Sequence, residues 1–244
     1  MNELRALTRS EAKLLFREPI SWLAAVALPT AILLIFGTLF SKQGPDAGLG
    51  GLRFIDVFVP SLVVITVGTL GIQALPIRLA TYREKGVLRR LSTTPADPLR
   101  LLAAQLMTYL ATALVALVLL VVVARIVFDV PLPHSPIGYV AAVALGTSAM
   151  FVLGLILAAV APSARVATAI GIPLFFMVMF LGGVYVPRAA LPEVLVRLGE
   201  FTPPGVQGLQ DAWVGSGPQL GPLVVLAMLT VVGGVLAARL FRWE

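Results

Sequence analysis

The sequence predicts an all-α polytopic membrane protein with six transmembrane helices, and three observations support this fold class. Hydrophobic residues make up 59% of the 244 residues and the mean hydropathy is +0.98, whereas soluble domains hold ~45–50% apolar residues. The chain contains six apolar runs of roughly 20 residues, the length that a helix needs to cross a bilayer core. Lys and Arg also gather in the segments that lie on one side of such a bundle. We therefore expect a single membrane domain over residues 1–244.

The apolar runs locate the expected spans. They cover residues 20–40, 57–79, 101–123, 137–161, 167–186 and 221–240. The first run is longer than the ~7–15 apolar residues of a cleaved signal peptide, so we expect it to be a retained span. Interior prolines such as Pro29 and Pro173 are compatible with membrane helices, because neighbouring helices satisfy the backbone groups that proline frees.

The distribution of positive charge predicts the orientation. The chain has 18 Lys and Arg against 12 Asp and Glu, for a net charge of +6. With both termini inside, all of these cations are cytoplasmic except five, namely Lys42, Arg53, Arg125, Arg188 and Arg197. The positive-inside rule therefore predicts a multi-pass protein of the plasma (inner) membrane with both termini in the cytoplasm. Topology explains the basic composition, and we expect no nucleic-acid partner.

Residues 1–18 precede the first span and carry four cations at four-residue spacing. Arg5, Arg9, Lys13 and Arg17 form one stripe of a helix, and leucines lie toward another face. This pattern suits an amphipathic helix in the inner interface, with its cations at the lipid phosphates. The alternative is a solvated helix whose glutamates pair with the same cations.

A dense basic segment, Tyr82 to Pro95, lies between the second and third spans. Residues 80–91 have helix-forming composition apart from Gly86, and Pro95 ends the helix because the residue before a proline disfavours helical backbone. A charged loop can serve only to enforce topology, but a compact basic helix exceeds that need. We therefore predict a docking surface for a cytoplasmic partner, made by Arg83, Glu84, Lys85, Gly86, Leu88, Arg89 and Arg90.

The outer segment between the last two spans holds two short helical patterns, at about 192–198 and 204–213. Neither can cross a bilayer, since apolar stretches of ~10–14 residues are typical of interfacial or re-entrant segments. A surface hairpin is the alternative, but the apolar face of the first pattern and a tryptophan expected at headgroup depth favour partial insertion. The expected re-entrant outer helices include Pro192, Leu195, Pro203, Pro204 and Trp213.

Motifs for nucleotide, metal and covalent chemistry are missing from the sequence. No Gly-Lys-Ser or Gly-Lys-Thr occurs, so an ATP-driven machine would take its ATPase from another polypeptide. The chain has no cysteine, and its single histidine, His134, lies in a proline-rich outer loop without neighbouring ligands. We therefore expect no catalytic, cofactor-binding or metal-binding residues.

The expected spans carry no Asp, Glu, Lys or His away from their ends. Because ion-coupled transporters need an intramembrane ionisable group, this absence disfavours a secondary transporter. The fifth span instead offers aromatic and flexible apolar side chains, which suit a cavity for hydrophobic substrates, although helix packing or lipid contact explains them equally well. The candidate cavity residues are Phe175, Phe176, Met179 and Phe180.

Several fragments, taken in order, give the chain a resemblance to a known family. They are Arg17-Glu18-Pro19, the run Pro29 to Phe40, Arg83-Glu84-Lys85-Gly86 through Leu88-Arg89-Arg90-Leu91 and Pro95, Gly182-Gly183, Pro187, Leu191-Pro192 and Pro203-Pro204. On these fragments the chain resembles, nearly end to end, the ABC-2 type permeases. These are the membrane subunits of ATP-binding cassette exporters, and the multidrug or daunorubicin-resistance branch is the most similar.

The resemblance implies roles for the segments described above. Residues 1–18 would be a connecting helix, and residues 84–91 a coupling helix that docks on a separate ATPase subunit. Two copies of that ATPase would hold the ATP and Mg, while this chain would be no enzyme and bind no cofactor. Two six-span subunits, expected as a homodimer in membrane lipid, would pair around a path for a hydrophobic small molecule, capped by the outer helices.

The expected function is export of a hydrophobic or amphipathic compound, such as a drug or lipid, and two alternatives stay open. The first is a non-transporting membrane scaffold or immunity protein that recruits a cytoplasmic partner through the same basic loop. The second is an exporter of polysaccharide or lipid-linked glycan from the same family. Such relatives typically have an aromatic-rich segment with Tyr and Trp before the first span, where this chain has only Trp22.

Overall fold

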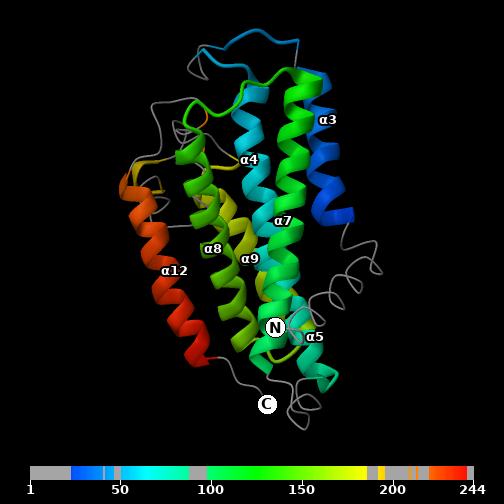
Figure 1. The fold of residues 1–244 in the computed structure, drawn as a ribbon, viewed down its shortest axis with the longest axis vertical. Coiled ribbons are helices and arrows are strands. Elements are labelled where there is room, and N and C mark those ends of the chain that lie inside the picture. The colour runs from blue at the N-terminus through cyan, green and yellow to red at the C-terminus, as the bar shows by residue number, and fades with distance from the viewer. Residues whose placement is uncertain are drawn as a thin grey trace.

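The computed structural model of the chain describes residues 23–40, 42–46, 51–87, 98–185, 192–195, 209, 213 and 220–240. Within these ranges the regular structure is helical, with one isolated antiparallel bridge between Asp46 and Leu52. The long helices run side by side, so that their ends gather at two opposite ends of the bundle (Figure 1). The all-α membrane fold expected from the sequence is confirmed.

The elements follow the order of the apolar runs. They are the π-helix η1 (Leu23–Ala27), α3 (Leu28–Phe40), α4 (Phe54–Gly68), the π-helix η3 (Thr69–Ala74), α5 (Leu75–Glu84), α7 (Pro98–Phe128), α8 (Pro136–Val160), α9 (Ala164–Leu181) and α12 (Leu220–Leu240). Five helices in the described ranges are long and apolar enough to cross a bilayer, and they match the second to sixth expected spans. The shorter apolar helix Ala25–Phe40 is the described part of the expected first span.

Local chemistry accounts for where two of these helices differ from their expected bounds. The third span was expected to end at residue 123, yet α7 continues to Phe128, where the ion pair between Arg125 and Asp129 supports its last turn. The fifth span starts earlier than residue 167, because the Ser163 hydroxyl accepts a hydrogen bond from the Val166 amide and caps α9. It also ends earlier, at Leu181.

The second span is one continuous helix from Phe54 to Glu84, interrupted in its middle by the π-helical segment η3. Pro76 lies at the start of α5 and has no backbone N–H. The carbonyls of Gly71 and Ile72, five and four residues earlier, cannot receive a helical hydrogen bond from it. The π-helical segment η3, which ends two residues before Pro76, accommodates this missing donor.

Glycines let other helices approach those two carbonyls. A Cβ atom on Gly154 of α8 would overlap the Gly71 carbonyl oxygen, and one on Gly171 of α9 would lie 3.2 Å from the Ile72 oxygen. Both glycines therefore allow backbone-to-backbone contact, where Cα–H groups face the exposed carbonyls. Helices α8 and α9 therefore pack closely against the second span at η3.

The long second helix changes its packing partners at η3. Its N-terminal half, α4, packs on α3 and α7, whereas its C-terminal half, α5, packs chiefly on α8 and α9. The last helix, α12, lies beside α8 (Figure 1). Its Gly233 is close to Val152, and most of its described side chains are exposed. The helix Phe54–Glu84 thus joins two groups of helices.

Candidate functional site

The basic segment predicted to dock a partner begins at the C-terminal end of α5. The structure differs from the separate helix expected over residues 80–91, because residues 80–84 form the last turns of the second span. The helix ends at Glu84, and Gly86 adopts a left-handed φ of +64°, which glycine tolerates best. Glu84 and Lys85 are exposed there, while Leu88, Arg89 and Arg90 lie outside the described residues.

Arg83 does not point outward with these neighbours. Its guanidinium donates hydrogen bonds to the backbone oxygens of Ala158 and Ala161, at 3.0 and 2.8 Å. These oxygens lie at the C-terminal end of α8, so the side chain joins the end of α5 to the end of α8. Arg83 was predicted to belong to the docking surface, and its side chain is half-buried against the end of α8. Sequence spacing could not reveal this contact, which joins residues more than 70 positions apart.

Tyr82 anchors the other side of the same turn. Its ring is buried with Leu101 of α7 and packs with Val87, and the Arg78 guanidinium lies 4.9 Å from the ring centroid. Arg78 also donates to the Tyr82 hydroxyl at 3.2 Å. The end of α5 is therefore held on one side by α7 and on the other by α8, so the segment leading to the docking residues starts from a fixed position.

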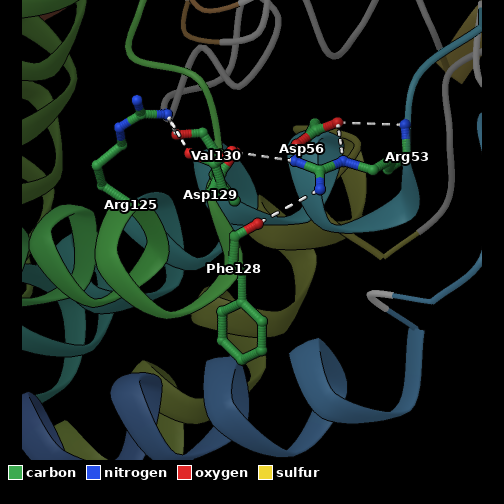
Figure 2. A network of polar contacts seen from close by, with 6 residues as sticks. All are labelled: Arg53, Asp56, Arg125, Phe128, Asp129 and Val130. Atoms are coloured by element: carbon green, nitrogen blue, oxygen red, sulfur yellow. Dashed lines mark hydrogen bonds and ion pairs between the residues drawn. The ribbon is translucent and has the colours of Figure 1, made fainter.

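A second polar network lies at the opposite end of the bundle and was not predicted as a site. Arg53 makes a two-bond ion pair with Asp56, with Nη2–Oδ1 and Nε–Oδ2 distances of 2.8 and 3.0 Å (Figure 2). Asp56 is only 5% exposed. This hydrogen-bonded partner raises the pKa of Arg53, so the guanidinium stays charged. The sequence signal was available, since both residues stand at the edge of an apolar run.

The same arginine joins α4 to the end of α7. Its Nη1 and Nη2 atoms donate to the backbone oxygens of Phe128 and Asp129, at 3.3 and 3.2 Å. The Phe128 ring points away from this network toward α3 (Figure 2) and fills the space beside Gly37, where a Cβ atom would overlap the ring. The Arg53 hydrogen bonds and the Phe128 ring thus connect α3, α4 and α7 at this end of the bundle.

The four side chains predicted to line one cavity do not share an exposed surface. Phe175 and Met179 are buried and pack against Gly68 of α4. Phe176 and Phe180, which are 54% and 39% exposed, lie on the outward face of α9. This separation corrects the prediction, and it follows from the 100° turn per residue of an α-helix, which sends neighbouring residues to different faces.

An apolar groove lies elsewhere, between α7 and α8. It has a volume of about 540 Å³ and is lined by the stretch Leu110 to Val122 of α7 and the stretch Tyr139 to Ser148 of α8. The only polar lining residues are Tyr139, Thr147 and Ser148. The groove can therefore hold an apolar molecule or acyl chain, but it offers no charge to bind an ionic one.

The described parts of the outer segment contact the bundle. Leu209 is buried between α4 and α8, where it lines a small cavity with Val67 and Thr147. Trp213 was expected at headgroup depth but is buried in the protein. It meets the Tyr139 ring edge-on at 5.1 Å, and its carbonyl accepts a hydrogen bond from the His134 amide. Protein contacts, and not lipid headgroups, surround this tryptophan.

Several predicted elements fall where the structure gives no description. They are the connecting helix 1–18 and the residues Pro203 and Pro204 of the expected outer helices. Pro192 and Leu195 are described and belong to one short turn, in which the Leu195 amide donates to the Pro192 oxygen. Among the described residues, no group of three or more His, Cys, Asp or Glu side chains is placed to hold a metal ion.

Comparison with known families agrees with the bundle and its long apolar helices. The family model described as ABC-2 type transporter matches residues 2–204 of the chain. The chain belongs to the ABC-2 type transporter family. A search of curated proteins gave no match. As an ABC-2 family member it is a multi-pass membrane protein, a transporter component and not a catalytic enzyme, and such permeases generally work with an ABC ATPase subunit.

Proposed function

We propose that the chain is the permease subunit of an exporter that moves a hydrophobic or amphipathic compound, such as a drug or lipid, out of the cytoplasm. Two copies of this chain would pair with two copies of a separate ATPase subunit, which binds ATP and Mg. The match to the ABC-2 type transporter family over residues 2–204 carries the proposal. The chain would lie in the inner membrane, with both termini on the cytoplasmic side.

The apolar surfaces of the bundle support a hydrophobic cargo. The groove between α7 and α8 is lined almost entirely by apolar side chains, and Phe176 and Phe180 present exposed rings on α9. Such surfaces bind apolar molecules by excluding water and adapt to different shapes. An ionic or heavily hydroxylated cargo would leave its polar groups without partners there.

The cytoplasmic end of α5 supports the contact with the ATPase. Glu84 and Lys85 are exposed at the end of a helix that crosses the whole bundle. The cations Arg89 and Arg90 follow within one or two turns of chain. A partner that pushes on this segment therefore acts on a long helix whose end is already fixed by Tyr82 and Arg83.

Charge reversal in the docking segment tests the ATPase contact. We expect Arg89→Glu combined with Arg90→Glu to abolish the stimulation of ATP hydrolysis that the permease gives its ATPase, because like charges replace attractive ones at the interface. The measurement is ATPase activity of the complex in nanodiscs. Arg239→Glu, an exposed cation at the end of α12, is the matched control and should keep the stimulation. Unchanged stimulation in the double variant would contradict the docking role.

Transport itself is tested in inside-out vesicles that contain the permease together with the ATPase encoded beside it. We expect accumulation of a hydrophobic dye that requires ATP and stops when the ATPase carries a substitution in its catalytic site. A complex that forms but moves no compound from a panel of hydrophobic dyes and lipids would instead favour the scaffold function.

A further inference from the structure

Arg83 occupies the position where the docking segment meets the rest of the membrane domain. It lies one residue before Glu84, and its side chain binds the oxygens of Ala158 and Ala161 at the C-terminal end of α8. Carbonyls at a helix C-terminus carry partial negative charge and lack helical donors. A guanidinium therefore forms charge-assisted hydrogen bonds with them, which are stronger than neutral ones.

The sequence explains why α8 needs an external donor at this point. The Ala158 oxygen would normally receive the amide of the residue four positions later, but that residue is Pro162, which has no N–H. Arg83 supplies the missing hydrogen bond from another helix. The same nitrogen, Nη1, also donates to the Ala161 oxygen, whereas the nitrogen of a lysine lies one bond nearer the backbone than Nη1.

Close apolar packing reinforces the contact. Ala80 of α5 is buried against Leu157, Ala161 and Ala167, at the tight connection between α8 and α9. These side chains are mostly small, so the three helices approach closely. The hydrogen bonds of Arg83 lie at the cytoplasmic edge of this cluster, and the end of α5 forms one body with the α8–α9 hairpin.

We propose that Arg83 is a positioning residue for transport, which transmits displacement of the ATPase-facing segment to the α8–α9 hairpin through the end of α8. This inference rests on the proposed function. The ATPase moves the segment after Glu84, and the hydrogen bonds of Arg83 make α8 and α9 follow. Without them the segment moves while the hairpin stays, so ATP is hydrolysed with less transport.

The test compares transport per ATP hydrolysed in the full complex of permease and ATPase. Arg83→Met keeps an unbranched stem that reaches about as far as Nε of the arginine, and removes the charge and the donors. We expect this variant to assemble and hydrolyse ATP, while dye transport per ATP falls about tenfold, the size expected for losing a charge-assisted hydrogen bond. Arg83→Lys should give an intermediate ratio. The control Arg165→Met removes an exposed cation from the start of α9 and should keep the wild-type ratio.

The readout separates positioning from a purely structural role. A structural role lowers the amount of folded complex and leaves transport per ATP unchanged, and that result would overturn the proposal. If Arg83→Met does not assemble, the ratio for Arg83→Lys decides, since a wild-type value overturns the proposal and a reduced value supports it. Failure of the wild-type permease to bind the ATPase, or to transport, overturns the proposed function itself and is visible before any variant is made.

A distance measurement tests the mechanical link directly. The chain has no cysteine, so Thr81→Cys on α5 and Ala169→Cys on α9 can carry one pair of spin labels in each copy of the chain. We expect the distance between the labels to stay constant when the complex binds ATP, and to change on ATP binding in the Arg83→Met background. A change of the same size with Arg83 intact would overturn the proposal.

Discussion

Two arginines near the ends of one long helix use the same chemistry. Arg53, just before α4, donates to carbonyls at the C-terminal end of α7, and Arg83, in the last turn of α5, donates to carbonyls at the C-terminal end of α8. In both cases a guanidinium supplies donors to the partly negative end of a neighbouring helix. The helix Phe54–Glu84 is thus attached to one neighbour at its N-terminal end and to a different one at its C-terminal end.

The buried carboxylate of Asp56 orients Arg53. We expect Asp56→Asn to lower the free energy of unfolding by about 1–3 kcal/mol. The substitution removes the negative charge from a buried, hydrogen-bonded pair, so the Arg53 guanidinium loses its charged partner and keeps only neutral ones there. Asp129→Asn is the matched control. Its side chain is 85% exposed in the pair with Arg125, and such pairs contribute at most about 1 kcal/mol. Thermal unfolding midpoints in nanodiscs measure both, and equal midpoints would contradict the role given to Asp56.

At the scale of elements, η3 is where the second span changes partners. Its π geometry and the missing donor of Pro76 expose the carbonyls of Gly71 and Ile72, and glycines on α8 and α9 allow close approach to them. Bulky residues in place of these glycines would keep α8 and α9 further from η3. Close packing at Gly154 therefore depends on backbone contact, which a larger residue would disturb.

Gly154→Ala tests this contact. The added methyl group would overlap the Gly71 carbonyl oxygen, so α8 must move away from η3, and we expect a loss of about 1–3 kcal/mol of stability together with reduced transport. Gly234→Ala on α12 is the control, since a Cβ atom there meets nothing within 4 Å. The alanine should be neutral or slightly stabilising in that helix. Unfolding midpoints of the two variants decide, and a neutral Gly154→Ala would refute the close packing.

For the whole molecule, hydropathy was enough to locate the helices but not to orient them. The cost of placing polar groups in lipid acts on composition, so the apolar runs coincide with the observed spans. The helices are apolar all round, so no periodic stripe shows which face is inside. Phe175 and Phe176 illustrate this, as one is core and the other exposed. The link from Arg53 to Phe128 spans 75 positions, and only the packed structure brings the two together.

The orientation of the whole bundle can be tested with two single cysteines in the cysteine-free chain. Lys42 and Lys85 are both exposed, and the helix of 31 residues between them is about 46 Å long, so they lie on opposite sides of a bilayer. The excess of cations on the Lys85 side predicts that this end is cytoplasmic. We expect a membrane-impermeant maleimide to label Lys42→Cys in intact right-side-out vesicles, and Lys85→Cys only after permeabilisation. The reverse pattern would place the docking segment outside, where no ATPase could reach it.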